Sequence, residues 1–164
     1  MHYKLAFSSL LSVALFSGVA HAAICTAEQK EAVSTAYETF RSASRSGDLK
    51  QVKALSTEAI TRQIVAFEKN APSAASLARM MGALSPALAE GTDIRCEQRQ
   101  RKARLIISTV AVDKSSGKQV PVASVVMFEQ GHGNNWLVGM KGGTSPSSAQ
   151  PLETLLQHDA FRLR

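Results

Sequence analysis

Residues 103–129, ARLIISTVAVDKSSGKQVPVASVVMFE, decide the fold class. The segments 103–112 and 120–129 are rich in β-branched residues, which favour strands. The polar loop between them places Gly117 where a hairpin turn needs a residue that adopts a left-handed conformation. Pro121 stands near the start of the returning segment, where an edge strand or a first position tolerates a proline. The stretch therefore predicts an antiparallel β-hairpin.

Two further strands are expected on either side of this hairpin. The segment 94–100 precedes it. The segment 136–140 follows it, after the turn-like sequence QGHGNN at 130–135. Because strands that are consecutive in the chain usually pair with one another, we expect a meander of about four antiparallel strands.

The half of the chain before the sheet has the composition of helices. Residues 26–90 are rich in Ala, Leu, Lys and Glu. Thr26, with Gln29 three positions later, predicts a capping box, and Gly47 predicts the end of the first helix. Helices followed by strands are typical of an α+β domain. Further helices are expected to begin at Asp48, after Ser56 or Thr57, and at Ser73, with Pro72 and Pro86 as interruptions.

The N-terminus has the pattern of a cleavable signal peptide. Lys4 supplies a short positive region, residues 5–20 are apolar, and Ala20-His21-Ala22 offers small residues where signal peptidase cleaves. An uncleaved membrane anchor is the alternative. The apolar stretch is too short for it, because about 20 residues are needed to cross a bilayer.

These features set the expected organisation and location of the protein. Cleavage near Ala22 or Ala23 removes residues 1–22 as the signal peptide. Residues 23–143 then form a single α+β domain, and residues 144–164 form a tether with a short amphipathic helix. The processed protein is expected to be periplasmic or secreted, with no transmembrane segment.

Both cysteines, Cys25 and Cys96, lie beyond the expected cleavage site. An even number of cysteines in an exported chain favours one disulfide, although two free thiols or an intermolecular pair are alternatives. On the chain-entropy model a bridge that closes a loop of this length stabilises the fold by roughly 4 kcal/mol. Two cysteines without a histidine nearby in sequence do not form a zinc signature, so we expect no metal and no cofactor.

The segment 95–104 carries an unusual run of basic residues. As one continuous strand it would place Glu97 and Arg104 on opposite faces, with charges on both. Such a strand is expected at an edge or in a protruding hairpin that turns near residue 101. Two roles are open: a patch for an anionic partner, or charges that keep an edge strand from pairing with other chains. Nucleic acid is not expected, because interleaved aromatic residues are missing. The candidate patch consists of Arg95, Arg99, Arg101, Lys102 and Arg104.

No catalytic residue is assigned. Only His132 and His158 remain after processing, and His132 lies between two glycines in a turn. Glu97 lies in the basic segment and Glu129 at a strand end, so neither is expected to be buried. General acid–base catalysis needs two groups within hydrogen-bonding reach, and nothing in the spacing predicts such a pair.

Several short motifs resemble those of nuclear transport factor two-like domains. These are Tyr37-Glu38-Thr39-Phe40 followed by Ser46-Gly47-Asp48-Leu49, the strand–Gly117-Lys118–strand hairpin, and Trp136-Leu137-Val138. The likeness covers most of the processed chain, but residues 71–90 and the tail after position 143 depart from it. It implies helices packed on a curved sheet, with a pocket in the mouth of a cone. The pocket candidates are Tyr37, Phe40, Met80, Met81 and Trp136. For the two methionines the alternative is that they are ordinary residues of the hydrophobic core.

The superfamily that these motifs resemble includes both isomerase-like enzymes and non-catalytic modules, so the fold alone does not choose between them. We expect an exported, non-catalytic binding or protein-interaction module that uses the cone pocket or the basic hairpin. Its partner would be a protein, a small apolar ligand or an anionic component of the cell envelope. A small pocket enzyme, and a secretion-system component or toxin-immunity partner, are the alternatives. A homodimer through the open face of the sheet is also left open.

Overall fold

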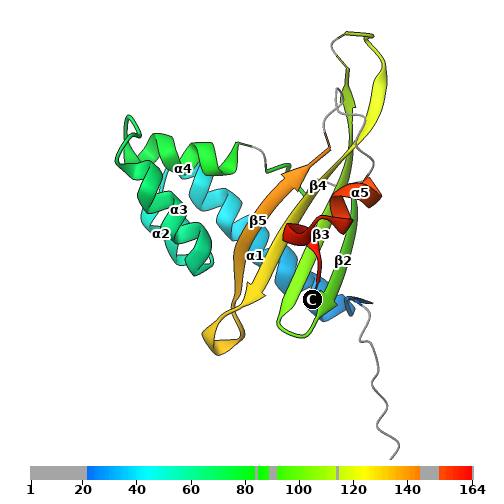
Figure 1. Ribbon diagram of the computed structural model, residues 1–164, viewed down its shortest axis with the longest axis horizontal. Helices are drawn as coiled ribbons and strands as arrows, with labels where there is room; N and C mark the ends of the chain where they lie inside the picture. Colours follow the sequence, from blue (N-terminus) through cyan, green and yellow to red (C-terminus); the bar gives the residue numbers. More distant parts are fainter. Residues whose placement is uncertain (1–21, 84, 89–91, 114, 145–151, 164) are drawn as a thin grey trace, which may run out of the picture.

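A computed structural model describes residues 22–83, 85–88, 92–113, 115–144 and 152–163. The expected signal peptide, apart from its last residue, and the tether at 145–151 lie outside these ranges. Four helices come first in the chain and an antiparallel sheet follows, which confirms the α+β fold class. Figure 1 shows helices α1 to α4 on one side of the sheet and the C-terminal helix α5 on the other.

The first helix, α1 (Ala27–Ser46), has the expected caps at both ends. The Thr26 hydroxyl accepts a hydrogen bond from the Gln29 amide at 3.2 Å, and Gln29 Oε1 accepts one from the Thr26 amide at 2.8 Å. Gly47 adopts a φ of 83°, a left-handed conformation that glycine reaches at little cost and that ends the helix. Local sequence therefore fixes the length of α1.

Three shorter helices complete the helical layer. The side chains of Asp48 and Ser73 cap α2 and α4 as expected. Thr57 is the N-cap residue of α3, although its side chain makes no capping hydrogen bond. The helices span Leu49–Ala54 (α2), Glu58–Glu68 (α3) and Ala74–Gly82 (α4).

The described part of the sheet has five strands in the order of the sequence, and every neighbouring pair is antiparallel. The additional strand is β1, which pairs two residues with the outer edge of β2. Two residues are too few to show an alternating pattern, so the sequence did not predict β1. The strands are β1 (Ala23–Ile24), β2 (Asp93–Arg99), β3 (Lys102–Val112), β4 (Gln119–Gln130) and β5 (Trp136–Gly143).

The long β3–β4 hairpin explains how the sheet accommodates a proline. Pro121 lies opposite Val110 of β3, whereas β5 pairs with β4 only from Ser124 onward. One edge of β4 is therefore not hydrogen-bonded to β5 at position 121, so a residue without an N–H is tolerated there. Gly117 adopts a φ of 67° in the hairpin loop, as expected.

Each face of the sheet is covered by a different part of the chain. The inner face packs against α1, and Tyr37 and Phe40 are fully buried in this main core. The outer face packs against α5 (Leu152–Gln157) and a following 3₁₀ turn, η2 (Asp159–Phe161). The outer cluster joins Leu155, Phe161 and Leu163 to Ile106, Ala123, Val125 and Met127.

Within the described ranges, none of the helices combines the length and the apolar character that crossing a membrane requires.

Candidate functional site

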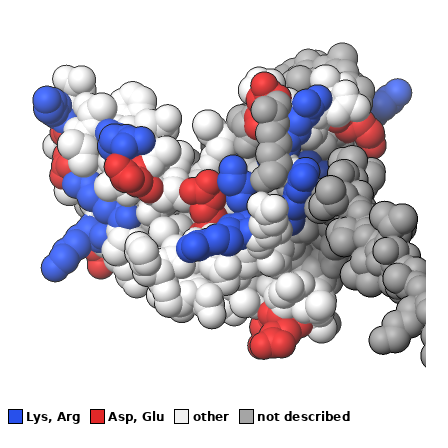
Figure 2. All heavy atoms as spheres, turned by 60° about the horizontal axis from the view of Figure 1, so that its bottom comes forward, with Lys and Arg blue, Asp and Glu red and all other residues white. Residues whose placement is uncertain are grey.

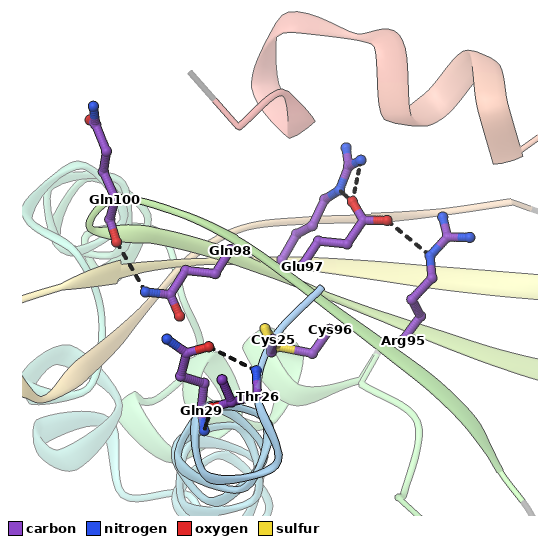
Figure 3. Close-up of a disulfide and its surroundings, with 9 residues drawn as sticks. Cys25, Thr26, Gln29, Arg95, Cys96, Glu97, Gln98 and Gln100 are labelled. Carbon is purple, nitrogen blue, oxygen red and sulfur yellow. Dashed lines mark hydrogen bonds and ion pairs between the residues drawn. A yellow bond between two sulfur atoms is a disulfide. The ribbon is translucent and has the colours of Figure 1, made fainter. Parts of the chain in front are cut away.

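The disulfide between Cys25 and Cys96 is present, with the two Cα atoms 5.4 Å apart. It joins Cys25, the residue before the N-cap of α1, to the middle of β2, and the Cys25 amide also donates to the Cys96 carbonyl at 3.0 Å. Figure 3 shows the Arg95 and Glu97 side chains extending from β2 away from the disulfide. Because residues alternate along a strand, Cys96 faces the helices while its two neighbours face the C-terminal segment.

The basic run folds back on itself in a hairpin, one of the two arrangements that were expected for it. A turn at Gln100 and Arg101 separates β2 from β3, so that Glu97 pairs with Arg104 and Arg99 pairs with Lys102. Residues paired across two strands lie on the same face, which corrects the expected placement of Arg104 opposite Glu97. Glu97 was also expected to be exposed, yet its side chain is only 14 % exposed because Arg104 and the C-terminal segment cover it.

Arg104 and Arg99 hold the C-terminal segment on the outer face of the sheet. Arg104 forms an ion pair with Glu97, in which its Nε atom lies 2.5 Å from Oε2. Its NH1 atom donates to the carbonyl of Phe161 at 3.0 Å and to that of Leu156 at 3.3 Å. Arg99 donates to the Leu163 carbonyl at 3.1 Å. These contacts link residues about 60 positions apart in the sequence.

The other basic residues of the candidate patch also have partners within the chain. Arg95 Nε lies 3.0 Å from Glu97, and Lys102 lies 3.8 Å from Glu129. Arg101 donates to the Gln130 carbonyl at 2.7 Å. On the face drawn in Figure 2, blue and red side chains lie among one another rather than forming one basic surface. Binding of an anionic partner to this patch stays a prediction.

The five pocket candidates separate into two groups. Tyr37 and Phe40 are 0 % exposed and Trp136 is 8 % exposed, so these three belong to the core. Met80, which is 57 % exposed, and Met81 line a pocket of about 430 Å³ between α4, the middle of β4 and the end of β5. This volume lies within the range typical of small-molecule sites. The remaining lining residues are Ser124, Val126, Lys141, Gly142, Gly143 and Thr144.

Lys141 is the charged group of this pocket. Its ammonium group donates to the Met81 carbonyl and, at 3.0 Å, to the Ser85 hydroxyl, and it lies 4.9 Å from the centroid of the Phe40 ring. Burial lowers the pKa of Lys141 to about 8. Among the described residues, no carboxylate lies within ion-pairing distance of it. A partly buried cation without a counter-charge is unusual, because buried charges are generally paired.

Lys141 was not predicted as a pocket residue, because a β-bulge changes the alternation along β5. Val138 pairs with Phe128 and Lys141 pairs with Val126, so three steps along β5 match two along β4. The extra residue shifts the inward face by one position. Simple alternation from Val138 would have pointed Met140 inward and Lys141 outward.

Tyr37 and Glu38 fix the loop that lies beside Lys141. The Tyr37 hydroxyl donates to the Pro86 carbonyl at 2.6 Å, and Glu38 accepts a hydrogen bond from the Leu88 amide at 3.0 Å. Burial raises the pKa of Tyr37 to about 12, so its phenol stays protonated at neutral pH. Both contacts come from α1, which therefore holds the loop 85–88 in place.

Neither of the two histidines among the described residues, His132 and His158, lines this pocket. His132 is exposed in the turn before β5, and His158 lies in the C-terminal segment, 6.3 Å from the Phe161 ring. In the described part of the chain, no three His, Cys, Asp or Glu side chains gather to hold a metal ion.

Comparisons with family models, with curated proteins and with solved structures find no match to this chain. The likeness to nuclear transport factor two-like domains therefore stays a prediction.

Proposed function

We propose that the protein is an exported, non-catalytic binding module for a small amphipathic anion. The ligand would place an apolar body against Met80 and Met81 and a carboxylate against Lys141. The observation that carries this proposal is Lys141, an ammonium group at the wall of an apolar pocket without a counter-charge among the described residues.

The hydrogen bonds of Lys141 support this assignment. An ammonium group has three N–H donors. Met81 and Ser85 accept from Lys141, which leaves one donor and the positive charge for a ligand. A charge-assisted hydrogen bond contributes about 1.5 to 3 kcal/mol, which corresponds to roughly 10- to 100-fold in affinity. The exposed and adaptable Met80 side chain suits an apolar chain of varied shape.

Two features favour binding over catalysis. None of the eight described residues that line the pocket is an acid or a histidine. Tyr37, the only tyrosine beyond the leader, lies beneath the surface with its phenol bonded to a carbonyl. Lys141, with a pKa of about 8, could exchange a proton near neutral pH. General acid–base catalysis needs a second such group within reach, and neither the other described lining residues nor Tyr37 supplies one.

The sequence pattern and the disulfide support export. The leader-like residues 1–22 would direct the chain out of the cytoplasm. A disulfide such as Cys25–Cys96 persists in oxidising compartments and is rare in the cytosol. Both features support a periplasmic or secreted location.

The proposal is tested with decanoate and decanol as probes on residues 23–164, by isothermal titration calorimetry at pH 7. We expect decanoate to bind at least tenfold more weakly to Lys141→Met than to the unchanged protein. Decanol, which lacks the charge, is expected to bind both proteins equally. Lys118→Met is the matched control, since Lys118 is exposed in the hairpin loop and its loss changes the net charge equally. Equal decanoate binding to both variants, or none to the unchanged protein, would overturn the proposal.

A further inference from the structure

A second hollow, of about 360 Å³, lies between α1 and α4 and is lined by three arginines. Arg41 and Arg45 come from consecutive turns of α1, and Arg79 comes from the last turn of α4. The other lining residues are Gly82, Ala83 and Ser85, so none of the described residues that line it is acidic.

The positive charge around this hollow exceeds the negative charge that the chain supplies. Arg41 pairs with Glu38 at 2.8 Å, but its Nε atom is buried and has no hydrogen-bond partner among the described residues. Arg45 and Arg79 are exposed and form no ion pair within the described ranges. Lys141 lies behind the wall of the hollow, where it donates to Ser85. Three cations therefore line the hollow, a fourth lies behind Ser85, and Glu38 is the one carboxylate among the described residues that pairs with any of them.

Helix ends offer another explanation for two of these arginines, since cations are favourable at the C-terminus of a helix. The carbonyls there already have other donors, however. In α1, the Ala43 carbonyl accepts from the Asp48 amide at 3.0 Å. In α4, the Met80 carbonyl accepts from the Ala83 amide at 3.2 Å, and Met81 accepts from Lys141. Arg45 and Arg79 are thus not used as caps, and capping does not explain why three guanidinium groups meet in one hollow.

We propose that this hollow, named the arginine site (Arg41, Arg45 and Arg79), binds a phosphate or sulfate group. A guanidinium group presents N–H donors in a planar fork that matches two oxygens of an oxyanion. The forks of Arg45 and Arg79, which come from two helices, and the charge of Arg41 beside them suit a tetrahedral anion, which has more oxygens to share among these groups than a carboxylate has. The arginine site shares no described lining residue with the Lys141 pocket and does not depend on the ligand proposed there.

The test is a titration of the processed protein with inorganic phosphate, followed by the amide and arginine Nε signals in ¹⁵N NMR spectra. We expect saturable shifts centred on residues 41–45 and 79–85, with acetate binding at least tenfold more weakly. Arg45→Gln/Arg79→Gln is expected to abolish the shifts. Both residues are exposed, so the variant keeps the fold, which its spectrum checks directly.

The matched control is Arg62→Gln/Arg162→Gln, which removes two exposed arginines away from the hollow and changes the net charge equally. Phosphate binding that both variants weaken to the same extent would show a general charge effect and overturn the proposal, as would shifts that do not saturate. Free phosphate and a lipid headgroup share this chemistry. Sedimentation with phosphatidylglycerol vesicles distinguishes them: loss of vesicle binding in the Arg45/Arg79 variant alone assigns the site to a lipid, and no vesicle binding assigns it to a free phosphate group.

Discussion

The ring of Phe161 lies so close to Gly142 that a Cβ atom at position 142 would stand 2.4 Å from the Cζ atom of the ring. Phe161 belongs to the C-terminal segment, on the face of the sheet opposite to α1, and Gly142 belongs to β5. The missing side chain at Gly142 makes room for the ring, which is buried there. The sequence of β5 is therefore adapted to the segment that covers it.

We expect Gly142→Ala to displace the Phe161 ring and to lower the free energy of unfolding by about 1 to 3 kcal/mol, the usual cost of overpacking. Urea denaturation measures the free energy of unfolding of Gly142→Ala, of Phe161→Ala and of the double variant Gly142→Ala/Phe161→Ala. The double variant is expected to lose less than the sum of the two, because the added methyl group fills part of the space that the ring leaves. Strictly additive losses would show that the two residues do not interact.

The ion pair between Glu97 and Arg104 gives a second test of how the C-terminal segment is held. Arg104→Gln leaves the mostly buried Glu97 carboxylate with the more exposed Arg95 as its remaining ion-pair partner among the described residues, at an expected cost of about 2 kcal/mol. Amide hydrogen exchange should become faster in residues 152–163 and stay unchanged in α1. Arg62→Gln is the control, because its pair with Glu58 is exposed and such pairs contribute at most about 1 kcal/mol. Unchanged exchange in 152–163 would mean that Arg104 does not hold the segment.

The elements that local chemistry determines were predictable from the sequence. The capping box at Thr26, the left-handed Gly47 and the caps at Asp48 and Ser73 each depend on residues within three or four positions. The hairpin around Gly117 depends on its own turn. For these elements the local pattern and the fold agree, which is why a single sequence was enough.

The candidate site was less predictable, because its residues come together through long-range pairing. Lys141 faces inward only because one extra residue in β5 changes the alternation, and no local pattern marks that bulge. Arg104 contacts Leu156 and Phe161, which follow it by more than 50 positions. The sequence shows that this segment is basic, but it does not show which carbonyl groups the arginines bind in the folded protein.

The lowered pKa of Lys141 predicts a dependence of stability on pH. Because burial disfavours the charged form, the folded protein holds fewer protons than the unfolded chain between pH 8 and 10.5. Stability contributed by this group is therefore complete above pH 10.5 and is lost as the pH falls toward 8. We expect the unchanged protein to gain at most about 3 kcal/mol relative to Lys141→Met across this window.

Urea denaturation between pH 8 and 10 measures this gain. The upper limit avoids the range in which the raised pKa of Tyr37 lowers stability, since the folded protein there holds a proton that the unfolded chain releases. Lys118→Met is expected to follow the unchanged protein at every pH. If the free energy of unfolding changed with pH in the same way for the unchanged protein and for Lys141→Met, the burial of the Lys141 ammonium group would be contradicted.

Removal of the disulfide is expected to lower the thermal midpoint substantially. The loop that it closes separates its ends by 71 positions, and the chain-entropy model gives about 4 kcal/mol for such a loop. At roughly 3 °C per kcal/mol the midpoint should fall by about 10 °C. Scanning calorimetry of Cys25→Ser/Cys96→Ser measures the change, and added reductant should affect only the unchanged protein. A midpoint that is insensitive to both treatments would show that the bridge contributes no stability.

The disulfide also imposes an order in time. During synthesis or export Cys25 emerges 71 positions ahead of Cys96, and the helices α1 to α4 emerge between them. The thiol of Cys25 must therefore wait, unpaired, while the whole helical half of the chain appears. With two cysteines in the chain, it has no incorrect partner in its own molecule. Mispairing can occur only between two copies, so its frequency depends on how many unfinished chains are present together.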